Sequence, residues 1–189
     1  MTYKHESSSL LARKKAKSSD RFYTELWAFM PLVKYLEGKT VLDPACGDKR
    51  MQKLFENFGI KTIGTDIESG DDFISPLFWP EDKYEFDVIV TNPPYSIKDK
   101  WLKRCYEIGK PFALLLPITA LGEQERIRMY KQYGIQLLLL NERVNFETPS
   151  GEGAGSWFFA SWFCWHLLPE SICFSDALPI ENYKEELPF

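Results

Sequence analysis

The sequence predicts an α/β layer fold built around a mostly parallel sheet. Short apolar segments, such as residues 112–116 and 135–140, alternate along the chain with longer segments of helical periodicity, such as residues 98–108. The short segments are apolar almost throughout, which is typical of strands that are buried on both faces of a parallel sheet. The alternation of strand and helix, without an internal repeat or an obvious linker, favours a layered architecture.

Four segments are predicted to be helical because their apolar residues recur at intervals of three or four. They cover residues 26–36, 48–58, 98–108 and 122–133, and Gly38 and Gly59 are expected to end the first two. The predicted strands are residues 39–43, 61–65, 86–91, 112–116, 135–140, 143–147 and 157–168. We expect the last two strands to form an antiparallel pair around a glycine-rich loop, and the tail after Pro169 shows little pattern.

Length and composition predict one folded domain. A chain of 189 residues is large enough for a sizeable core, and its contents of 44% hydrophobic and 15% aromatic residues are typical of a globular protein. Residues 1–19 are polar and rich in serine and lysine. We therefore predict a flexible basic tail over residues 1–19 and a single domain over residues 20–189.

The sequence disfavours several classes of protein. No apolar run is long enough to cross a bilayer, since the richest, residues 157–168, is too short, and the N-terminus lacks the pattern of a secretory signal. We therefore expect a cytoplasmic protein with no membrane partner. The four cysteines share no Cys-x-x-Cys spacing and the chain has two histidines, so we predict no metal site.

The charge pattern leaves nucleic-acid binding open. The formal net charge of −4 does not by itself indicate a nucleic-acid-binding protein. Basic residues nevertheless gather within residues 13–21, 98–104 and 126–131. Each cluster is compatible with phosphate contacts and equally with a solvated helix face.

The most informative motif is Asn92-Pro93-Pro94-Tyr95, which directly follows the predicted strand 86–91. The two prolines cannot continue a strand ladder and restrict the residue before them, so we expect a stiff loop at the carboxyl end of the strand. Open α/β sheets bind their ligands at this edge. The Asn92 side-chain oxygen and the Pro93 carbonyl can accept both hydrogens of an exocyclic NH2 group, and the Tyr95 ring can stack on the planar system that carries it. The motif therefore indicates methylation of a planar amine.

A second set of residues indicates a site for a nucleotide-like cofactor. The strand 39–43 ends in Asp43-Pro44-Ala45-Cys46-Gly47, where the glycine lets the backbone pass close to a ligand. Asp66 follows the next strand, nineteen residues after Gly47, where doubly wound folds place an acid that binds ribose hydroxyls. Asp71, Asp72 and Phe73 come next and offer carboxylates and a ring for an adenine.

These motifs, in this order, resemble those of the class I S-adenosylmethionine-dependent methyltransferases that modify N6 of adenine in DNA. The resemblance covers roughly residues 20–168 and is to compact enzymes of phage or prophage type. It implies a Rossmann-like fold, with a mostly parallel seven-stranded sheet, an antiparallel C-terminal hairpin and helices on both faces. It also implies S-adenosylmethionine as cofactor, DNA as partner and, for a phage-encoded protein, the host cytoplasm as location.

The resemblance assigns roles to individual residues. The catalytic residues that it implies are Asn92, Pro93, Pro94 and Tyr95. The cofactor-binding residues that it implies lie in an N-terminal motif, after the first two strands and in the catalytic loop: Tyr23, Thr24, Asp43, Pro44, Ala45, Cys46, Gly47, Asp66, Ile67, Asp72, Phe73 and Asn92. No metal is implied. A base in a duplex would have to be flipped out to enter the Asn-Pro-Pro-Tyr pocket.

The chain departs from the usual family pattern in three places. It has Lys49 where a second glycine usually follows Gly47, and Glu25 where the N-terminal motif often has proline. It also has no insert large enough for a separate target-recognition domain. Target recognition by a homodimer, or together with a partner subunit, therefore stays open.

Three alternative functions stay open as well. The same catalytic motif occurs in enzymes that methylate adenine in RNA and in enzymes that methylate a glutamine side chain in proteins. The glutamine enzymes usually carry an additional N-terminal helical domain, and only about twenty residues precede Arg21 here. The third alternative is a non-catalytic subunit that binds S-adenosylmethionine, and the intact motif at residues 92–95 argues against it.

Overall fold

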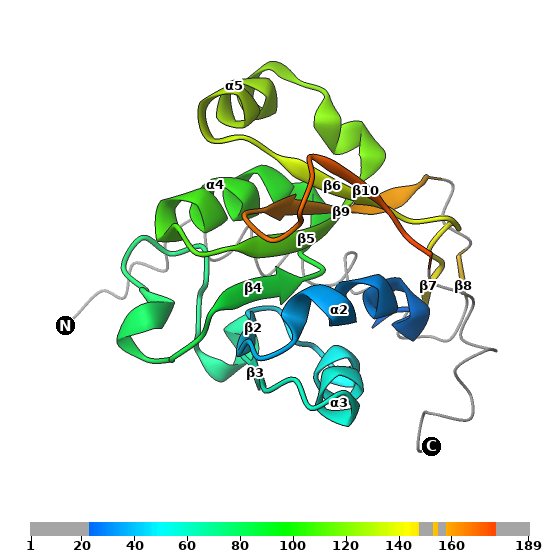
Figure 1. Cartoon of the computed structure of the whole chain (residues 1–189). Helices are drawn as coiled ribbons and strands as arrows, with labels where there is room; N and C mark the ends of the chain where they lie inside the picture. The colour runs from blue at the N-terminus through cyan, green and yellow to red at the C-terminus, as the bar shows by residue number, and fades with distance from the viewer. Residues whose placement is uncertain (1–22, 148–152, 155–157, 177–189) are drawn as a thin grey trace.

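A seven-stranded sheet forms the centre of the computed structural model, which describes residues 23–147, 153–154 and 158–176. The strand order is β10-β6-β9-β5-β4-β2-β3 (Figure 1). Neighbouring strands are parallel except where β9 runs antiparallel to β5 and β6. The predicted fold class, a Rossmann-like α/β fold with a mostly parallel seven-stranded sheet, is confirmed.

The elements follow the predicted alternation of strands and helices. The strands of the central sheet are β2 Val41–Asp43, β3 Thr62–Gly64, β4 Val88–Thr91, β5 Phe112–Pro117, β6 Gln136–Leu139, β9 Ala160–Trp165 and β10 Ile172–Phe174. The α-helices are α2 Val33–Leu36, α3 Arg50–Asn57, α4 Lys98–Ile108 and α5 Gln124–Tyr133. The 3-10 helices are η1 Leu26–Leu32, η2 Ile67–Ser69, η3 Pro80–Asp82, η4 Tyr95–Ile97 and η5 Ile118–Leu121. In the described part of the chain, none of the helices combines the length and the apolar character needed to traverse a bilayer.

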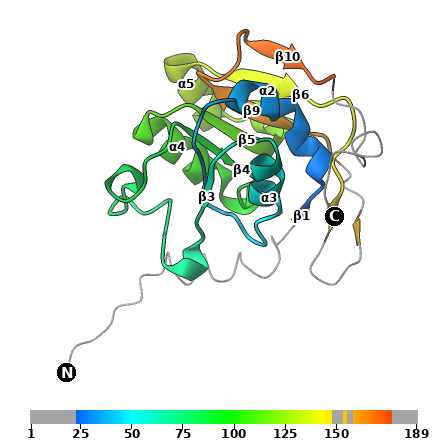
Figure 2. The same ribbon diagram turned by 60° about the horizontal axis from the view of Figure 1, so that its bottom comes forward.

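Helices cover both faces of the central sheet (Figures 1 and 2), as predicted. Successive residues of β5 point to opposite faces: Leu115 packs with Phe29 of η1 and Phe55 of α3 in one buried cluster. Leu114 packs with Leu102 of α4 in the other. Because both faces of the sheet are buried, its strands are apolar without alternation, which is the pattern that predicts a parallel sheet.

The predicted antiparallel C-terminal hairpin is present in the central sheet, but its strands are not the two that were expected, residues 143–147 and 157–168. Within the central sheet, β9 runs antiparallel to both of its neighbours, β5 and β6. The predicted strand 143–147 contributes only β7, Phe146–Glu147, which joins β1 (Tyr23–Thr24) and β8 (Gly153–Ala154) in a separate three-stranded sheet. Strand β10, which is parallel to β6, has no counterpart among the predicted strands, because three residues are too few to show a period.

The predicted helix at residues 26–36 is divided in two. Its first part is the 3-10 helix η1, which contains Pro31, and the remainder is the short helix α2. Proline lacks the N–H that an α-helical hydrogen bond needs, so Pro31 interrupts the α-helical pattern. The predicted apolar face is nevertheless buried, since Phe29, Leu32 and Leu36 all lie in the core.

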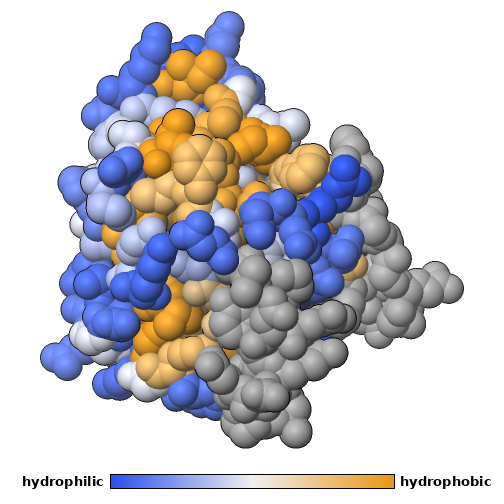
Figure 3. Space-filling model, turned by 45° about the vertical axis from the view of Figure 1, so that its right-hand side comes forward, coloured by the Kyte–Doolittle hydropathy of each residue, from blue (hydrophilic) through white to orange (hydrophobic). Residues whose placement is uncertain are grey.

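Strand β10 exposes apolar side chains at the edge of the sheet. Ile172 is 49% exposed and Phe174 is 69% exposed. Figure 3, which brings the side of the molecule with β7 and β8 forward, shows hydrophobic residues gathered in patches between hydrophilic ones. Edge strands and exposed apolar patches are features at which other chains can pair. Association with a second copy or with a partner subunit stays a prediction.

Substitution of Trp162 should show how much the hydrogen bond between β9 and η1 contributes to the free energy of unfolding. The side chain is fully buried, and its Nε1 donates a hydrogen bond to the carbonyl of Ala28 at 2.7 Å. In Trp162→Phe this carbonyl loses its donor, so we expect the free energy of unfolding to fall by about 1–3 kcal/mol, as measured by urea denaturation. Trp165→Phe is the matched control, because the Trp165 Nε1 donates to the Tyr133 carbonyl at an exposed position. An equal loss in both variants would contradict this account.

Candidate active site

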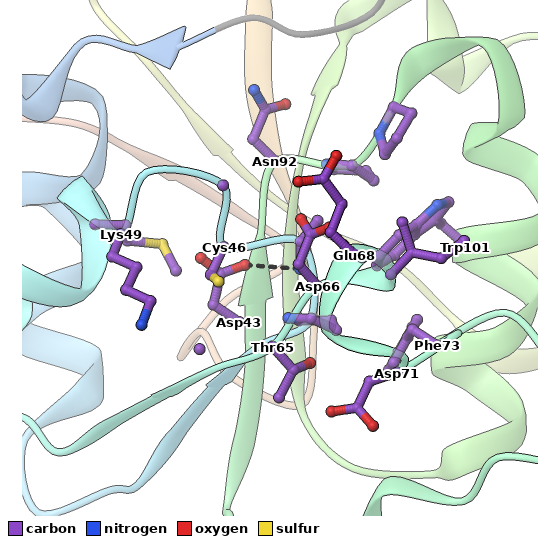
Figure 4. Close-up of a pocket in the computed structure, with 18 of the residues that line it drawn as sticks. Asp43, Cys46, Lys49, Thr65, Asp66, Glu68, Asp71, Phe73, Asn92 and Trp101 are labelled. Atoms are coloured by element: carbon purple, nitrogen blue, oxygen red, sulfur yellow. Dashed lines mark hydrogen bonds between the residues drawn. The ribbon is translucent and has the colours of Figure 1, made fainter. Parts of the chain in front are cut away.

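The carboxyl ends of β2, β3 and β4 lie next to one another because these strands are parallel neighbours. The loops that follow them line a cavity of about 540 Å³ (Figure 4), a volume in the range of small-molecule sites. The side chain of Tyr23, which was also predicted for the site, lies outside the described part of the structure. All other residues predicted for the site do line it: Thr24, Asp43, Pro44, Ala45, Cys46, Gly47, Asp66, Ile67, Asp72, Phe73, Asn92, Pro93, Pro94 and Tyr95.

Asn92 follows the last residue of β4 and lines the cavity (Figure 4), where one of its polar atoms has no hydrogen-bond partner in the described part of the chain. Its Nδ2 donates a hydrogen bond to Oγ1 of Thr24 at 2.8 Å. Its Oδ1 is buried and accepts no hydrogen bond from the described part of the chain. A buried acceptor without a donor costs about 1–3 kcal/mol, so a ligand N–H that reached this oxygen would be bound favourably.

The prolines and Tyr95 shape the loop between β4 and α4. Pro94 has φ −57° and ψ 120°, and its carbonyl accepts a hydrogen bond from the N–H of Ile97 at 3.2 Å, where η4 is formed. The ring of Tyr95 packs edge-on against Phe146 and Phe158, with centroid distances of 5.8 and 5.7 Å. Side chains far along the sequence therefore fix the position of the Tyr95 ring.

Asp43 ends β2 and is almost completely buried, with 4% of the residue exposed. Burial raises the pKa of Asp43 from its ordinary value to about 7, and the carboxylates of Asp66 and Asp48 act in the same direction. The N–H of Ala45 donates to Oδ1 of Asp43 at 3.2 Å and opposes this rise in pKa. A buried acid with a strongly shifted pKa that lines a cavity is a candidate for a functional group.

Backbone hydrogen bonds join the loops after β2 and β3. The N–H of Thr65 donates to the Asp43 carbonyl at 2.8 Å, and the N–H of Cys46 donates to the Thr65 carbonyl at 3.0 Å. Gly47 has φ 49°, in the left-handed region that glycine adopts readily. The segment 43–47 and the start of the Asp66 loop are therefore held in a fixed relation beside the cavity.

Lys49 occupies the position where the family pattern usually has glycine, and its backbone adopts a glycine-like conformation. Its φ is 64° and its ψ is 19°, which is left-handed geometry. This geometry costs a non-glycine residue about 1–2 kcal/mol. The adjacent Asp48 accepts hydrogen bonds from the N–H and Nε of Arg50, at 3.2 and 2.8 Å, so its carboxylate is engaged at the start of α3.

Asp66 follows β3 and caps the short helix η2. Its Oδ1 accepts a hydrogen bond from the N–H of Glu68 at 2.9 Å, and the hydroxyl of Ser69 accepts one from the N–H of Asp66 at 3.2 Å. These bonds keep the Asp66 side chain at the cavity, where Figure 4 shows it between Cys46 and Phe73. The acid predicted for ribose binding thus lies beside the cavity with its side chain held by local hydrogen bonds.

Asp71, which was expected to offer a carboxylate to an adenine, is instead bonded to other side chains of the protein. Its carboxylate accepts hydrogen bonds from Nζ of Lys83 and from the Tyr84 hydroxyl, both at 2.7 Å, and Figure 4 shows it directed away from Asn92.

Phe73 is 2% exposed and stacks on Trp101 of α4, with ring centroids 4.8 Å apart. Trp101 also lines the cavity. Trp101 was not among the residues predicted for the site, because its spacing on α4 is that of an ordinary core residue.

Two of the basic residues considered for phosphate contacts are structural. Arg104 is 3% exposed, and its guanidinium donates to the carbonyls of Phe73 and Phe78. Arg126 is 6% exposed, donates to the Ala120 carbonyl at 2.8 Å and pairs with Asp99 at 2.6 Å. The basic residues of these two clusters that remain exposed are Lys100, Lys103, Arg128 and Lys131. The third cluster, within residues 13–21, lies outside the described residues.

Comparisons with known proteins show only a general similarity to solved structures. No protein-family model matches the sequence, and no curated protein gives a significant match. One similar solved structure is a proposed RNA methyltransferase from Pyrococcus horikoshii, with a TM-score of 0.47 and 16% identity, covering 74% of this chain and 79% of that one. Another is the modification subunit of a proposed type I restriction enzyme from Vibrio vulnificus, with a TM-score of 0.43 and 18% identity, covering 82% of this chain and 47% of that one. The chain thus spans about half the length of this second protein. Similarity at this level leaves the function to be inferred from the chain's own residues.

The raised pKa of Asp43 predicts that its carboxylate lowers stability at neutral and alkaline pH. As the pH rises from about 4 to about 7, the unfolded chain releases the Asp43 proton while the folded chain retains it, so folding becomes less favourable. Above about pH 7 the full penalty is present. Asp43→Asn keeps the shape without the charge, so we expect its melting temperature to exceed that of the wild type at about pH 8 and to approach it at about pH 4.

Asp82→Asn controls for the loss of one negative charge, because Asp82 is exposed at the surface. A similar rise in the melting temperature of this variant would assign the effect to net charge. A wild type at least as stable as Asp43→Asn at about pH 8 would contradict the buried position of Asp43.

Proposed function

We propose that this protein transfers a methyl group from S-adenosylmethionine to the exocyclic N6 amine of adenine in DNA. The observation that carries the proposal is the buried Oδ1 of Asn92, which accepts no hydrogen bond from the described part of the chain and belongs to a residue that lines the cavity. It is followed by Pro93 and Pro94, whose carbonyls belong to the same stiff loop. An acceptor at this place, beside two strand ends with carboxylates, suits a planar amine together with a nucleoside-like cofactor.

The residues of the cavity fit S-adenosylmethionine. The volume of about 540 Å³ is in the range that accommodates ligands of this size. Asp66 lies after β3, where an acid can bind ribose hydroxyls. The buried Asp43 carboxylate favours a cationic group of the ligand, because a neighbouring positive charge would relieve the cost of its ionisation. The cofactor would supply an electrophilic methyl group on its sulfonium.

The chemical task of the protein would be to make N6 a better nucleophile. The lone pair of this amine is delocalised into the purine ring. Hydrogen bonds from its two N–H groups to the Asn92 side-chain oxygen and the Pro93 carbonyl would favour a tetrahedral nitrogen and a localised lone pair. The Tyr95 ring would stack on the base. Orientation of this kind contributes up to about 7–11 kcal/mol to rate enhancement without a strong general base.

Binding of nucleic acid would have to offset the cost of exposing the base. Flipping a base from a duplex costs a few kcal/mol. Helix α4 starts directly after 3-10 helix η4, and its exposed Lys100 could contact a phosphate, whereas Lys103 lies 4.0 Å from Glu107 in an ion pair. We propose DNA rather than RNA because the cofactor and catalytic motifs resemble those of the DNA adenine enzymes. Methylation of RNA, or binding of the cofactor without transfer, is an outcome that the test below would reveal.

The test is incubation of the purified protein with methyl-labelled S-adenosylmethionine and, separately, DNA, RNA and cell protein. We expect label in DNA and recovery of N6-methyladenine after digestion. Label confined to RNA would replace the proposed substrate, and label in protein alone would exclude nucleic-acid methylation. Binding of S-adenosylmethionine without transfer to any substrate would favour a non-catalytic subunit.

Asn92→Ala should separate catalysis from cofactor binding. The variant removes the oxygen that would hold the target amine, so we expect methyl transfer to fall at least about 100-fold. The dissociation constant for S-adenosylmethionine, measured by calorimetry, should change little. Loss of cofactor affinity with retained turnover would refute the assignment of Asn92.

Asp66→Ala should show the opposite pattern. Removal of the carboxylate would take away the proposed ribose contact, so we expect affinity for S-adenosylmethionine to fall by about 10-fold or more. Turnover at saturating cofactor should stay closer to that of the wild type than in Asn92→Ala. An unchanged dissociation constant would remove Asp66 from the site.

A further inference from the structure

A side-chain hydrogen bond joins β1, the first strand in the described part of the chain, to the loop after β4. Oγ1 of Thr24 accepts a hydrogen bond from Nδ2 of Asn92 at 2.8 Å, although 68 residues separate the two. Thr24 is 4% exposed, so water has little access to this bond. The Asn92 amide is therefore tethered through its nitrogen, and its oxygen is the end without a donor.

The orientation of this amide decides which group it offers to a ligand. A side-chain amide has an accepting oxygen at one end and a donating NH2 group at the other. Only the oxygen can accept an N–H from an amine, so a rotated amide would present the wrong group. A bond from Nδ2 to Thr24 leaves the oxygen as the end that is available.

The position of Thr24 is itself fixed by the three-stranded sheet. Strand β1 pairs with β7 in a register that places Thr24 opposite Phe146. Glu25 adds a second link, because its Oε2 accepts a hydrogen bond from the N–H of Asn145 at 2.9 Å. Phe146 in turn packs against the ring of Tyr95. Strands β1 and β7 therefore contact both ends of the loop at residues 92–95. Thr24 of β1 contacts Asn92, and Phe146 of β7 contacts Tyr95.

We infer that Thr24 is a positioning residue for methyl transfer, which holds the Asn92 amide with its oxygen available to the target amine. This inference rests on the proposed function, and it gives Thr24 a role other than the cofactor contact expected from the sequence. It also gives the small sheet a function, since β1 and β7 place the residue that orients the amide. Thr24 acts through Asn92, and the reacting atoms need not touch it.

The test compares Thr24→Val, which keeps the shape and removes the hydroxyl, with Thr24→Ser, which keeps the hydroxyl. Thr62→Val is the matched control, because the buried Thr62 hydroxyl bonds to the Ile60 carbonyl and its side chain does not line the cavity. We expect Thr24→Val to lower kcat about 10- to 100-fold, as misplacement of a reacting group does. The dissociation constant for S-adenosylmethionine and the KM for DNA should stay within about twofold, and Thr24→Ser should recover most of the rate.

Two further measurements keep the inference testable if Thr24→Val is poorly folded. In the background of Asn92→Ala, Thr24→Val should cause no additional loss of rate, because the residue that it positions is absent. The NMR signals of the Asn92 side-chain NH2, identified by their loss in Asn92→Asp, should exchange with solvent faster in Thr24→Val than in the wild type, Thr24→Ser or Thr62→Val.

The outcomes separate this inference from the proposed function. A Thr24→Val enzyme with full kcat, or one whose whole defect is lost affinity for S-adenosylmethionine, would overturn the positioning role while the methyltransferase assignment stands. A Thr24→Ser enzyme as slow as Thr24→Val would overturn it as well. A wild type that methylates no substrate would overturn the proposed function and the catalytic role of Thr24 together.

Discussion

The parallel pairing of β2, β3 and β4 is the constraint on which the candidate site depends. Parallel neighbours end at the same edge of a sheet, so the loops after Asp43, Gly64 and Thr91 meet there although long segments separate them in the sequence. Backbone bonds between Asp43, Cys46 and Thr65 then fix two of these loops to each other. The helices on both faces bury the sheet and leave its carboxyl edge as the place where polar groups can gather.

Several groups at this edge are arranged at the expense of stability. Asp43 is an acid in a buried position, Lys49 takes a backbone conformation that suits glycine, and the Asn92 oxygen lacks a donor in the described part of the chain. None of these features helps to pack the core. Strained or unsatisfied groups tend to persist where a ligand or a reaction requires them, and they occur together here around one cavity. This concentration supports a binding or catalytic role for the cavity.

Much of the fold could be predicted because its signals are local. Helix α4 has the predicted bounds, residues 98–108. Its apolar residues recur at helical spacing, and Gly109, with a φ of 74°, follows its last residue and ends it. Many residues that line the cavity could be predicted because their motifs directly follow strands, and the sheet topology brings the strand ends together. Their roles in binding and catalysis stay predictions. The domain limits and the basic tail over residues 1–19 stay predictions, and the tail lies outside the described residues.

The features that sequence reasoning missed depend on contacts between distant segments. Strands β1 and β8 have two residues each and show no period of their own. Arginine usually lies at the surface, yet Arg104 is buried. Its guanidinium donates hydrogen bonds to two backbone carbonyls of the segment 73–78. The Asp71 carboxylate accepts hydrogen bonds from Lys83 and Tyr84, which nothing in its own motif reveals.

The most direct test of the account is a crystal structure of the protein with sinefungin, an analogue of S-adenosylmethionine that carries an amine in place of the sulfonium methyl group. The account predicts that its ribose lies near Asp66 and that its amine is directed toward the Asn92 oxygen and the Pro93 carbonyl. An analogue bound outside this cavity would contradict the account. So would a loop at residues 92–95 that is turned away from the amine and leaves no room for a purine.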